Sequence, residues 1–149
     1  MKSVFNQNDN KEFVERINSL KPDDQAKWGK MNVSQMMLHC TRPIHVSLGN
    51  KKLKRGLIGI LFGGMAKKKL VGADQFGKNM PTDPSFIVKE NPDFNSSKSE
   101  LLSLVETLKT KGHAGLTTEP HPFFGKLTHP EWDALISKHL DHHLRQFGK

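Results

Sequence analysis

The sequence contains one cysteine and no tyrosine among its 149 residues. A single thiol, Cys40, cannot form an internal disulfide, and without a second cysteine a zinc finger is excluded. The first ten residues are polar and lack the apolar stretch that a signal peptide requires. The longest apolar run, residues 56–66, is too short to span a bilayer. We therefore expect a cytoplasmic protein without a membrane span.

Acidic residues are also in the minority, with 15 Asp and Glu against 23 Lys and Arg, which gives a net charge of +8. This balance allows an anionic partner but does not specify one. Hydrophobic residues make up 35% of the chain and charged residues 26%, as in ordinary globular proteins, so we expect a single domain over residues 1–149. The chain lacks the signature of a nucleic-acid-binding module and has few aromatic stacking platforms, so no specific nucleic-acid partner is expected.

Strand signals are weak, because Phe86, Ile87 and Val88 form the only β-like cluster. Helical periodicity instead predicts helices at residues 10–20, 32–48, 53–70, 97–110 and 128–147. Capping-box patterns open three of them, pairing Asn32 with Gln35, Ser97 with Glu100, and Thr128 with Glu131. Residues 71–94 are rich in Gly, Pro and Asp and are typical of a long ordered loop. The pattern predicts an all-α fold, an antiparallel helical bundle.

Two histidines, His139 and His143, fall in the apolar stripe of the last predicted helix. Residues four apart on a helix are roughly 5–6 Å apart at Cβ, so both imidazoles can reach one metal ion. The alternative is a pair of hydrogen-bonded imidazoles in the core or at the surface. His142 points about 100° away from His143 and is expected outside the site. Leu140 stands where a zincin protease needs glutamate, so a zincin is excluded.

A third ligand is required, and His39 is the best candidate. It follows Met36, Met37 and Leu38 in an apolar helix, where a polar ring without a partner would be out of place. The alternative is a histidine at the edge of an apolar stripe. The adjacent Cys40 could be a redox or metal-binding thiol, although a cysteine on an apolar helix face is more often a small core residue.

Two motifs carry a resemblance to the DinB/YfiT-like superfamily. Residues 28–39 (WGKMNVSQMMLH) resemble its second-helix segment, in which a tryptophan precedes a capped helix that bears a metal-binding histidine. Residues 139–146 (HLDHHLRQ) resemble its final-helix motif, two metal-binding histidines four apart and a glutamine three further on. Together with residues 121–128, the likeness covers nearly the whole chain and is greatest to an uncharacterised bacterial branch.

The resemblance implies a DinB/YfiT-like four-helix bundle with an unusual connection, an extra short helix and a long loop. It also implies a site in which His39, His139 and His143 hold zinc, nickel or a similar divalent ion. Three histidine nitrogens would leave a fourth position for water, as in catalytic zinc sites. Gln146 could orient a ligand of this site or could be a solvated residue near the helix end. The resemblance also implies kinship to transferases and isomerases that use bacillithiol or mycothiol, and with it a low-molecular-weight thiol as a second cofactor.

The sequence is compatible with two classes of function. The first is a metal-dependent enzyme, either a hydrolase or a thiol-dependent transferase, acting on a small-molecule substrate. The second is a non-catalytic protein that binds a metal or an anionic ligand. No residue is assigned a catalytic role, and the oligomeric state is open, a homodimer included.

Basic residues at 51–55 and 67–69 bracket the apolar residues 57–62. This arrangement could suit an anionic membrane or a nucleic acid. Three glycines lower the helix propensity of the segment, and its basic residues sit at the ends rather than along one face. We therefore predict a core helix with solvated charged ends.

Overall fold

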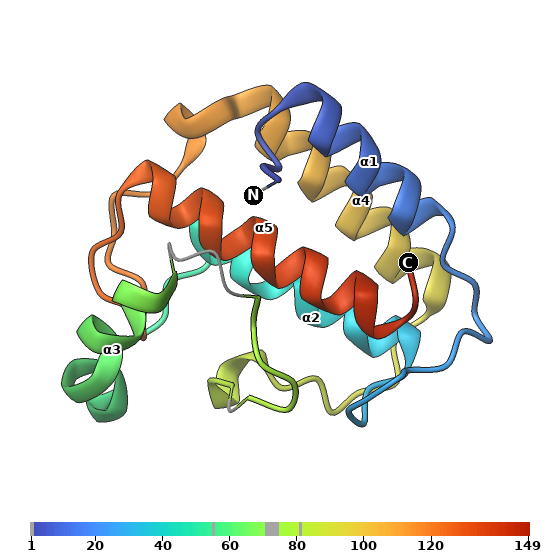
Figure 1. Cartoon of the computed structure of the whole chain (residues 1–149), viewed down its shortest axis with the longest axis horizontal. Coiled ribbons are helices and arrows are strands. Elements are labelled where there is room, and N and C mark those ends of the chain that lie inside the picture. Colours follow the sequence, from blue (N-terminus) through green and yellow to red (C-terminus); the bar gives the residue numbers. More distant parts are fainter. Residues whose placement is uncertain (1, 55, 71–74, 81) are drawn as a thin grey trace.

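The computed structural model describes residues 2–54, 56–70, 75–80 and 82–149 (Figure 1). Its five α-helices are α1 (Gln7–Asn18), α2 (Val33–Ser47), α3 (Leu57–Leu70), α4 (Phe94–Lys111) and α5 (His129–Gln146). Two 3₁₀ turns, η1 (Pro84–Phe86) and η2 (Gly112–Gly115), lie before and after α4. The described residues form no strand, only one isolated bridge between His121 and Gly125. The predicted all-α class is confirmed.

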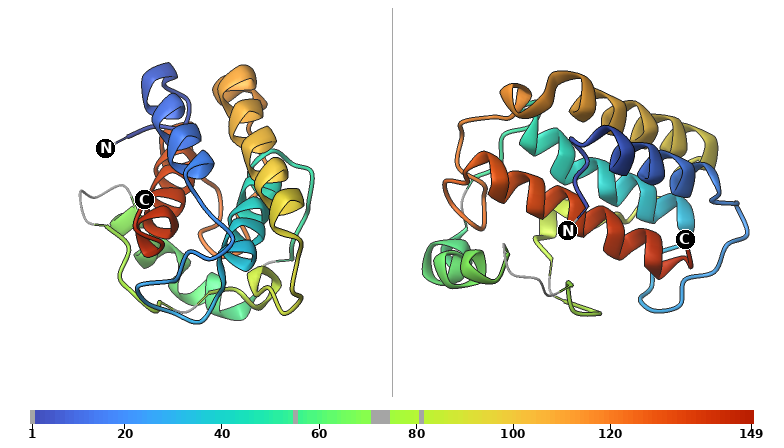
Figure 2. Two further views of the ribbon diagram at one scale, coloured as in Figure 1. Left: turned by 90° about the vertical axis from the view of Figure 1, so that its right-hand side faces the viewer. Right: turned by 45° about the horizontal axis from the view of Figure 1, so that its top comes forward.

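Four helices pack along one another, with α1 and α2 each contacting both α4 and α5 (Figure 2). In Figure 1, α1 and α5 run in one direction and α2 and α4 in the other. The predicted antiparallel packing therefore holds for α1 with α4 and for α2 with α5. The other two pairs, α1 with α5 and α2 with α4, are parallel. A parallel pair cannot be joined by a short turn, and the chain between α2 and α4 accordingly makes a long return that contains α3.

Side chains at the helix starts fix the bounds of the helices. The Asn32 side chain accepts from the N–H of Gln35 at 2.8 Å, and the Gln35 side chain accepts from the N–H of Asn32 at 3.1 Å, so the predicted capping box of α2 is present. The Thr128 and Glu131 box of α5 is present as well. The predicted Ser97 box is wrong: the N-cap of α4 is Asp93, four residues before Ser97, and the Ser97 hydroxyl donates to the Asp93 carbonyl.

The core lies between α1, α2, α4 and α5. The apolar stripe predicted for the last helix is buried throughout, at Trp132, Leu135, Ile136, Leu140, Leu144 and Phe147. Cys40 is buried in the same core beside Met36, and burial raises the pKa of its thiol. A thiol that stays protonated is a poor nucleophile and a poor metal ligand, which favours the role of a small core residue.

The α3 helix does not belong to this core, so the prediction of a core helix is wrong. It packs against α5 through few residues and protrudes from the body of the molecule (Figures 1 and 2). Its bulky apolar side chains face solvent, with Leu57 79% and Leu61 73% exposed. Apolar content alone predicted burial, but the helix contacts the body of the molecule through Gly59 and Gly63. Among the described residues, no helix is both long and apolar enough to cross a membrane.

Candidate metal centre

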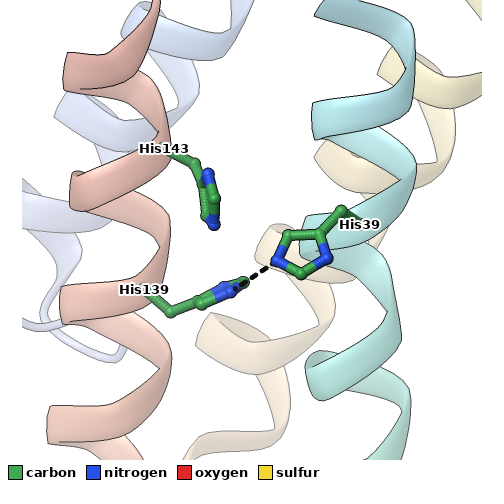
Figure 3. Close-up of side chains that lie close together, drawn as sticks. All are labelled: His39, His139 and His143. Atoms are coloured by element: carbon green, nitrogen blue, oxygen red, sulfur yellow. Dashed lines mark hydrogen bonds between the residues drawn. The ribbon is translucent and has the colours of Figure 1, made fainter. Parts of the chain in front are cut away.

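Neighbouring antiparallel helices bring three histidines together near the middle of the bundle. Figure 3 shows His139 and His143, one turn apart on α5, pointing toward His39 on α2. The Nε2 atoms of His39 and His139 are 3.0 Å apart, and the three rings offer nitrogen atoms that all lie within 4.8 Å of one another. His39 and His143 are buried, whereas His139 is partly exposed. The cluster is therefore closed off from bulk water on most sides.

The tautomer of His39 is fixed by a backbone carbonyl. Its Nδ1 lies 2.9 Å from the carbonyl oxygen of Phe86 in the η1 turn. A carbonyl can only accept a hydrogen bond, so Nδ1 must carry the proton and donate it. In the neutral ring, Nε2 is then the unprotonated atom, and this is the atom that faces His139. His39 thus presents a lone pair to the centre of the cluster, as a metal ligand does.

Gln146 fixes His143 in the same tautomer. The amide Nε2 of Gln146 donates to the backbone carbonyl of Trp28 at 2.6 Å, which leaves its Oε1 facing His143 Nδ1 at 2.8 Å. Because Oε1 can only accept, His143 Nδ1 carries the proton and Nε2 carries the lone pair. The expected orienting role of Gln146 has a structural basis in this chain of hydrogen bonds. The backbone carbonyl of Trp28 is the last acceptor in this series of hydrogen bonds.

Arg42 holds the segment that supplies the Phe86 carbonyl. Its guanidinium donates to the carbonyls on either side of Phe86, those of Ser85 at 3.2 Å and Ile87 at 2.8 Å, and pairs with the carboxylate of Glu90. A planar guanidinium can make all these bonds at once, which a lysine ammonium cannot do with the same geometry. Arg42 therefore ties the loop after η1 to α2, three residues beyond His39.

The electrostatics of the cluster favour neutral rings. Burial, together with the neighbouring histidines, lowers the pKa of His143 to about 3 and that of His139 well below its usual value. Burial also lowers the pKa of His39, opposed by the Phe86 carbonyl and reinforced by the positive charge of Arg42. Metal binding requires unprotonated imidazole nitrogens, so the environment holds all three histidines in the form that binds a metal.

His142 is not a member of the group that could hold a metal ion, although its ring lies 5.0 Å from that of His143. Its ring packs edge-on against the Trp28 ring, with centroids 5.5 Å apart, and lies 6.4 Å from the Phe76 ring. Burial lowers the pKa of His142 as well, opposed by a hydrogen bond to the Phe76 backbone. The structure thus places His39, His139 and His143 together and leaves His142 outside, as expected from the helical angle.

The donor set fits a divalent ion. Imidazole nitrogens bound to one tetrahedral zinc ion are about 3.3 Å apart, and the separation between His39 and His139 is close to this. Each of His39 and His143 already has its second nitrogen held by a hydrogen-bond acceptor, the arrangement typical of metal-binding histidines. Imidazole ligands suit zinc, copper, iron and nickel better than magnesium or calcium. The three-histidine group could therefore hold a metal ion.

Two contributors to this site were not anticipated from the sequence, Phe86 and Arg42. The sequence marks Phe86 only as part of a β-like cluster, because a backbone carbonyl has no signature in the sequence. Arg42 follows His39 by three residues and so shares its helix face, which was the one available signal.

Fold and site together define the class: an all-helical protein with a buried three-histidine cluster suited to a metal ion. The chain belongs to the family described as "Protein of unknown function (DUF1569)", which matches residues 2–149. No curated protein and no solved structure matched the chain.

Proposed function

We propose that the protein is a metal-dependent enzyme that acts on a small molecule at the three-histidine cluster, as a hydrolase or a thiol-dependent transferase. One observation carries the proposal: His39 and His143 turn their unprotonated nitrogens toward His139, and no fourth ligand residue joins the group among the described residues. A purely structural site would be closed by a fourth protein ligand. Among the described residues, only these three histidines form a group that could hold a metal ion.

A zinc or nickel ion held there would activate a small nucleophile, water or a low-molecular-weight thiol, by Lewis acidity. The protein's own contribution is to hold the three imidazoles neutral and in one orientation. The Phe86 carbonyl and the Gln146 amide hold the far nitrogens of His39 and His143. Burial in the bundle excludes bulk water from most of the site, which strengthens electrostatic effects inside it.

Kinship with the DinB/YfiT-like superfamily is part of the same proposal. The two motifs that carry the resemblance, residues 28–39 and 139–146, meet in one hydrogen-bonded network that runs from Trp28 through Gln146 to His143. Their convergence supports a shared type of site. The cytoplasm is the compartment we propose, because a low-molecular-weight thiol and the unpaired, buried Cys40 both suit reducing conditions.

Peptide hydrolysis is not part of the proposal. Leu140, at the position where a zincin needs its glutamate, is 1% exposed and packs in the core. Asp141, the acidic neighbour in the motif, bonds the guanidinium of Arg16 at 2.8 Å. A carboxylate engaged in this way is poorly placed to serve as the general base.

The first test is the metal content of the purified native protein and of single alanine variants. We expect one equivalent of metal in the native protein, loss of it in His39→Ala and His143→Ala, and retention in the matched control His142→Ala. Loss in the control with retention in the other two would overturn the assignment of the site.

The second test is turnover of a panel of small electrophiles and esters, with and without low-molecular-weight thiols, using His143→Ala as the blank. Thiol-dependent turnover that the blank lacks identifies a transferase, and thiol-independent turnover identifies a hydrolase. No turnover by the fully metallated protein would refute the enzyme proposal and favour the non-catalytic binding protein.

A further inference from the structure

Most of the exposed large apolar side chains among the described residues lie on one helix, α3. Five bulky apolar side chains of α3 are more than half exposed: Leu57 79%, Ile60 56%, Leu61 73%, Phe62 54% and Met65 68%. Single exposed apolar residues are ordinary on protein surfaces, but five on one helix form a contiguous patch. A helix of this composition is normally buried in protein or in lipid.

The outward direction of these side chains is built into the packing of α3. On its inner face, Gly59 and Gly63 lie directly against the backbone of Pro122 and Phe123. A Cβ at Gly59 would come within 2.7 Å of the Pro122 carbonyl oxygen, and one at Gly63 would be closer still to that of Phe123. Only glycine permits this approach. The helix therefore docks through Gly59 and Gly63, and the five exposed side chains lie away from this contact.

Positive charge is concentrated in the same part of the chain. Residues 25–73 contain ten Lys and Arg and no Asp or Glu, whereas the rest of the chain contains thirteen basic and fifteen acidic residues. Exposed lysines flank the apolar patch at Lys51, Lys52, Lys54 and Lys68. Lys52 has an exposed acidic neighbour, Glu119, at 3.4 Å. An exposed pair of this kind is weak and can exchange for another anion.

We propose that α3 is a docking element for an anionic membrane surface, with its apolar side chains inserted among the lipids and the flanking lysines on the acidic headgroups. This combination of an apolar helix face with basic residues beside it is what a helix lying in the membrane interface requires. A second copy of the chain is disfavoured as the occupant. A symmetric contact through α3 would place the same lysines opposite each other. A nucleic acid would leave the five apolar side chains in water.

The experiment is co-sedimentation of the full-length protein with vesicles of phosphatidylcholine, with and without phosphatidylserine. We expect binding only to the vesicles that contain phosphatidylserine, and weaker binding as salt is raised. Equal binding to both kinds of vesicle, or binding to neither, overturns the proposal.

Matched variants separate the apolar contribution. Leu57→Ser, Leu61→Ser and Met65→Ser change exposed side chains, so they leave the core intact, and each should weaken binding about tenfold. Met80→Ser, a change at another exposed apolar residue away from α3, should leave binding unchanged. If the α3 variants bind as the native protein does, or if Met80→Ser weakens binding equally, the assigned surface is wrong.

The charge contribution is tested with two variants of equal net charge. The first carries glutamine at Lys51, Lys52, Lys54 and Lys68, and each change should weaken binding about fivefold. The control carries glutamine at four exposed lysines elsewhere: Lys11, Lys21, Lys89 and Lys111. Equal loss in both variants would indicate a response to net charge alone and would overturn the proposal. A stable dimer that Leu61→Ser dissolves, together with no vesicle binding, would assign the patch to a second copy instead.

Discussion

His121 offers the sharpest test of how burial of a histidine controls the stability of this fold. It lies in the loop before α5, is only 4% exposed, and its Nδ1 accepts hydrogen bonds from the N–H groups of Phe123 at 3.0 Å and Phe124 at 3.2 Å. An acceptor must be unprotonated, so protonation of Nδ1 would break both bonds. Burial lowers the pKa of His121 to about 4, and the carboxylate of Asp83 opposes this shift.

The sign and size of the pH effect follow from this shift. The pKa of His121 is about 4 in the folded protein and 6.5 in the unfolded chain, so on acidification the unfolded chain takes up the proton first. The stability that the neutral ring contributes is therefore present above pH 6.5 and is lost as the pH falls toward 4. Between pH 7 and pH 5 the loss amounts to about 2 kcal/mol. For a chain of this length, that corresponds to a melting temperature lower by about 6 °C.

The measurement is urea unfolding at pH 7 and pH 5, with a chelator present so that metal binding does not contribute. We compare the native protein with His121→Asn, whose side-chain oxygen can accept from the same N–H groups but does not titrate. The free energy of unfolding of this variant should fall by about 2 kcal/mol less between the two pH values than that of the native protein. The control is His113→Asn, which removes an exposed histidine.

The comparison between variants matters because burial also lowers the pKa values of His39, His139 and His143. These rings contribute to the acid sensitivity of the native protein and of both variants alike. If His121→Asn shows the same change with pH as the native protein, the reasoning from burial and hydrogen bonding is refuted.

Three further predictions concern the site and the α3 helix. Gln146→Leu removes the acceptor that orients His143 and should weaken metal binding about tenfold to a hundredfold, measured by competition with a chromophoric chelator; unchanged affinity would show that the hydrogen bond does not position the ring. Arg42→Gln releases the loop that supplies the carbonyl for His39, so it should weaken metal binding and speed up proteolytic cleavage within residues 82–90. A variant that binds metal and resists proteolysis as the native protein does would show that Arg42 does not hold this loop. Gly63→Ala should displace α3 and expose it to proteolysis, whereas Gly64→Ala, with nothing within 4 Å of an added Cβ, should leave digestion unchanged or slower. Identical digestion of the two alanine variants would argue against close backbone packing.

The local structure of this protein follows largely from its sequence. Capping residues such as Asn32 and Thr128 start their helices where predicted, because a cap and its partner lie within one turn of each other. The apolar stripe of the last helix is buried as its spacing requires. The same helical spacing places His139 and His143 one turn apart and turns His142 away. The relative position of these two candidate ligands is therefore a local property of the helix.

Other features depend on contacts between distant segments, which the sequence pattern does not encode. His39 is 100 residues from His139, and only the packing of α2 against α5 brings their rings together. The Phe86 carbonyl that sets the tautomer of His39 belongs to a loop whose path is fixed by Arg42. The exposure of α3 was equally beyond prediction, since its apolar composition favours burial and only the close approach of Gly59 and Gly63 to residues 122–123 decides how it packs. Composition and period determined which residues form helices and which faces are apolar. Tertiary packing decided what each apolar face meets, because that depends on the shape of the neighbouring backbone.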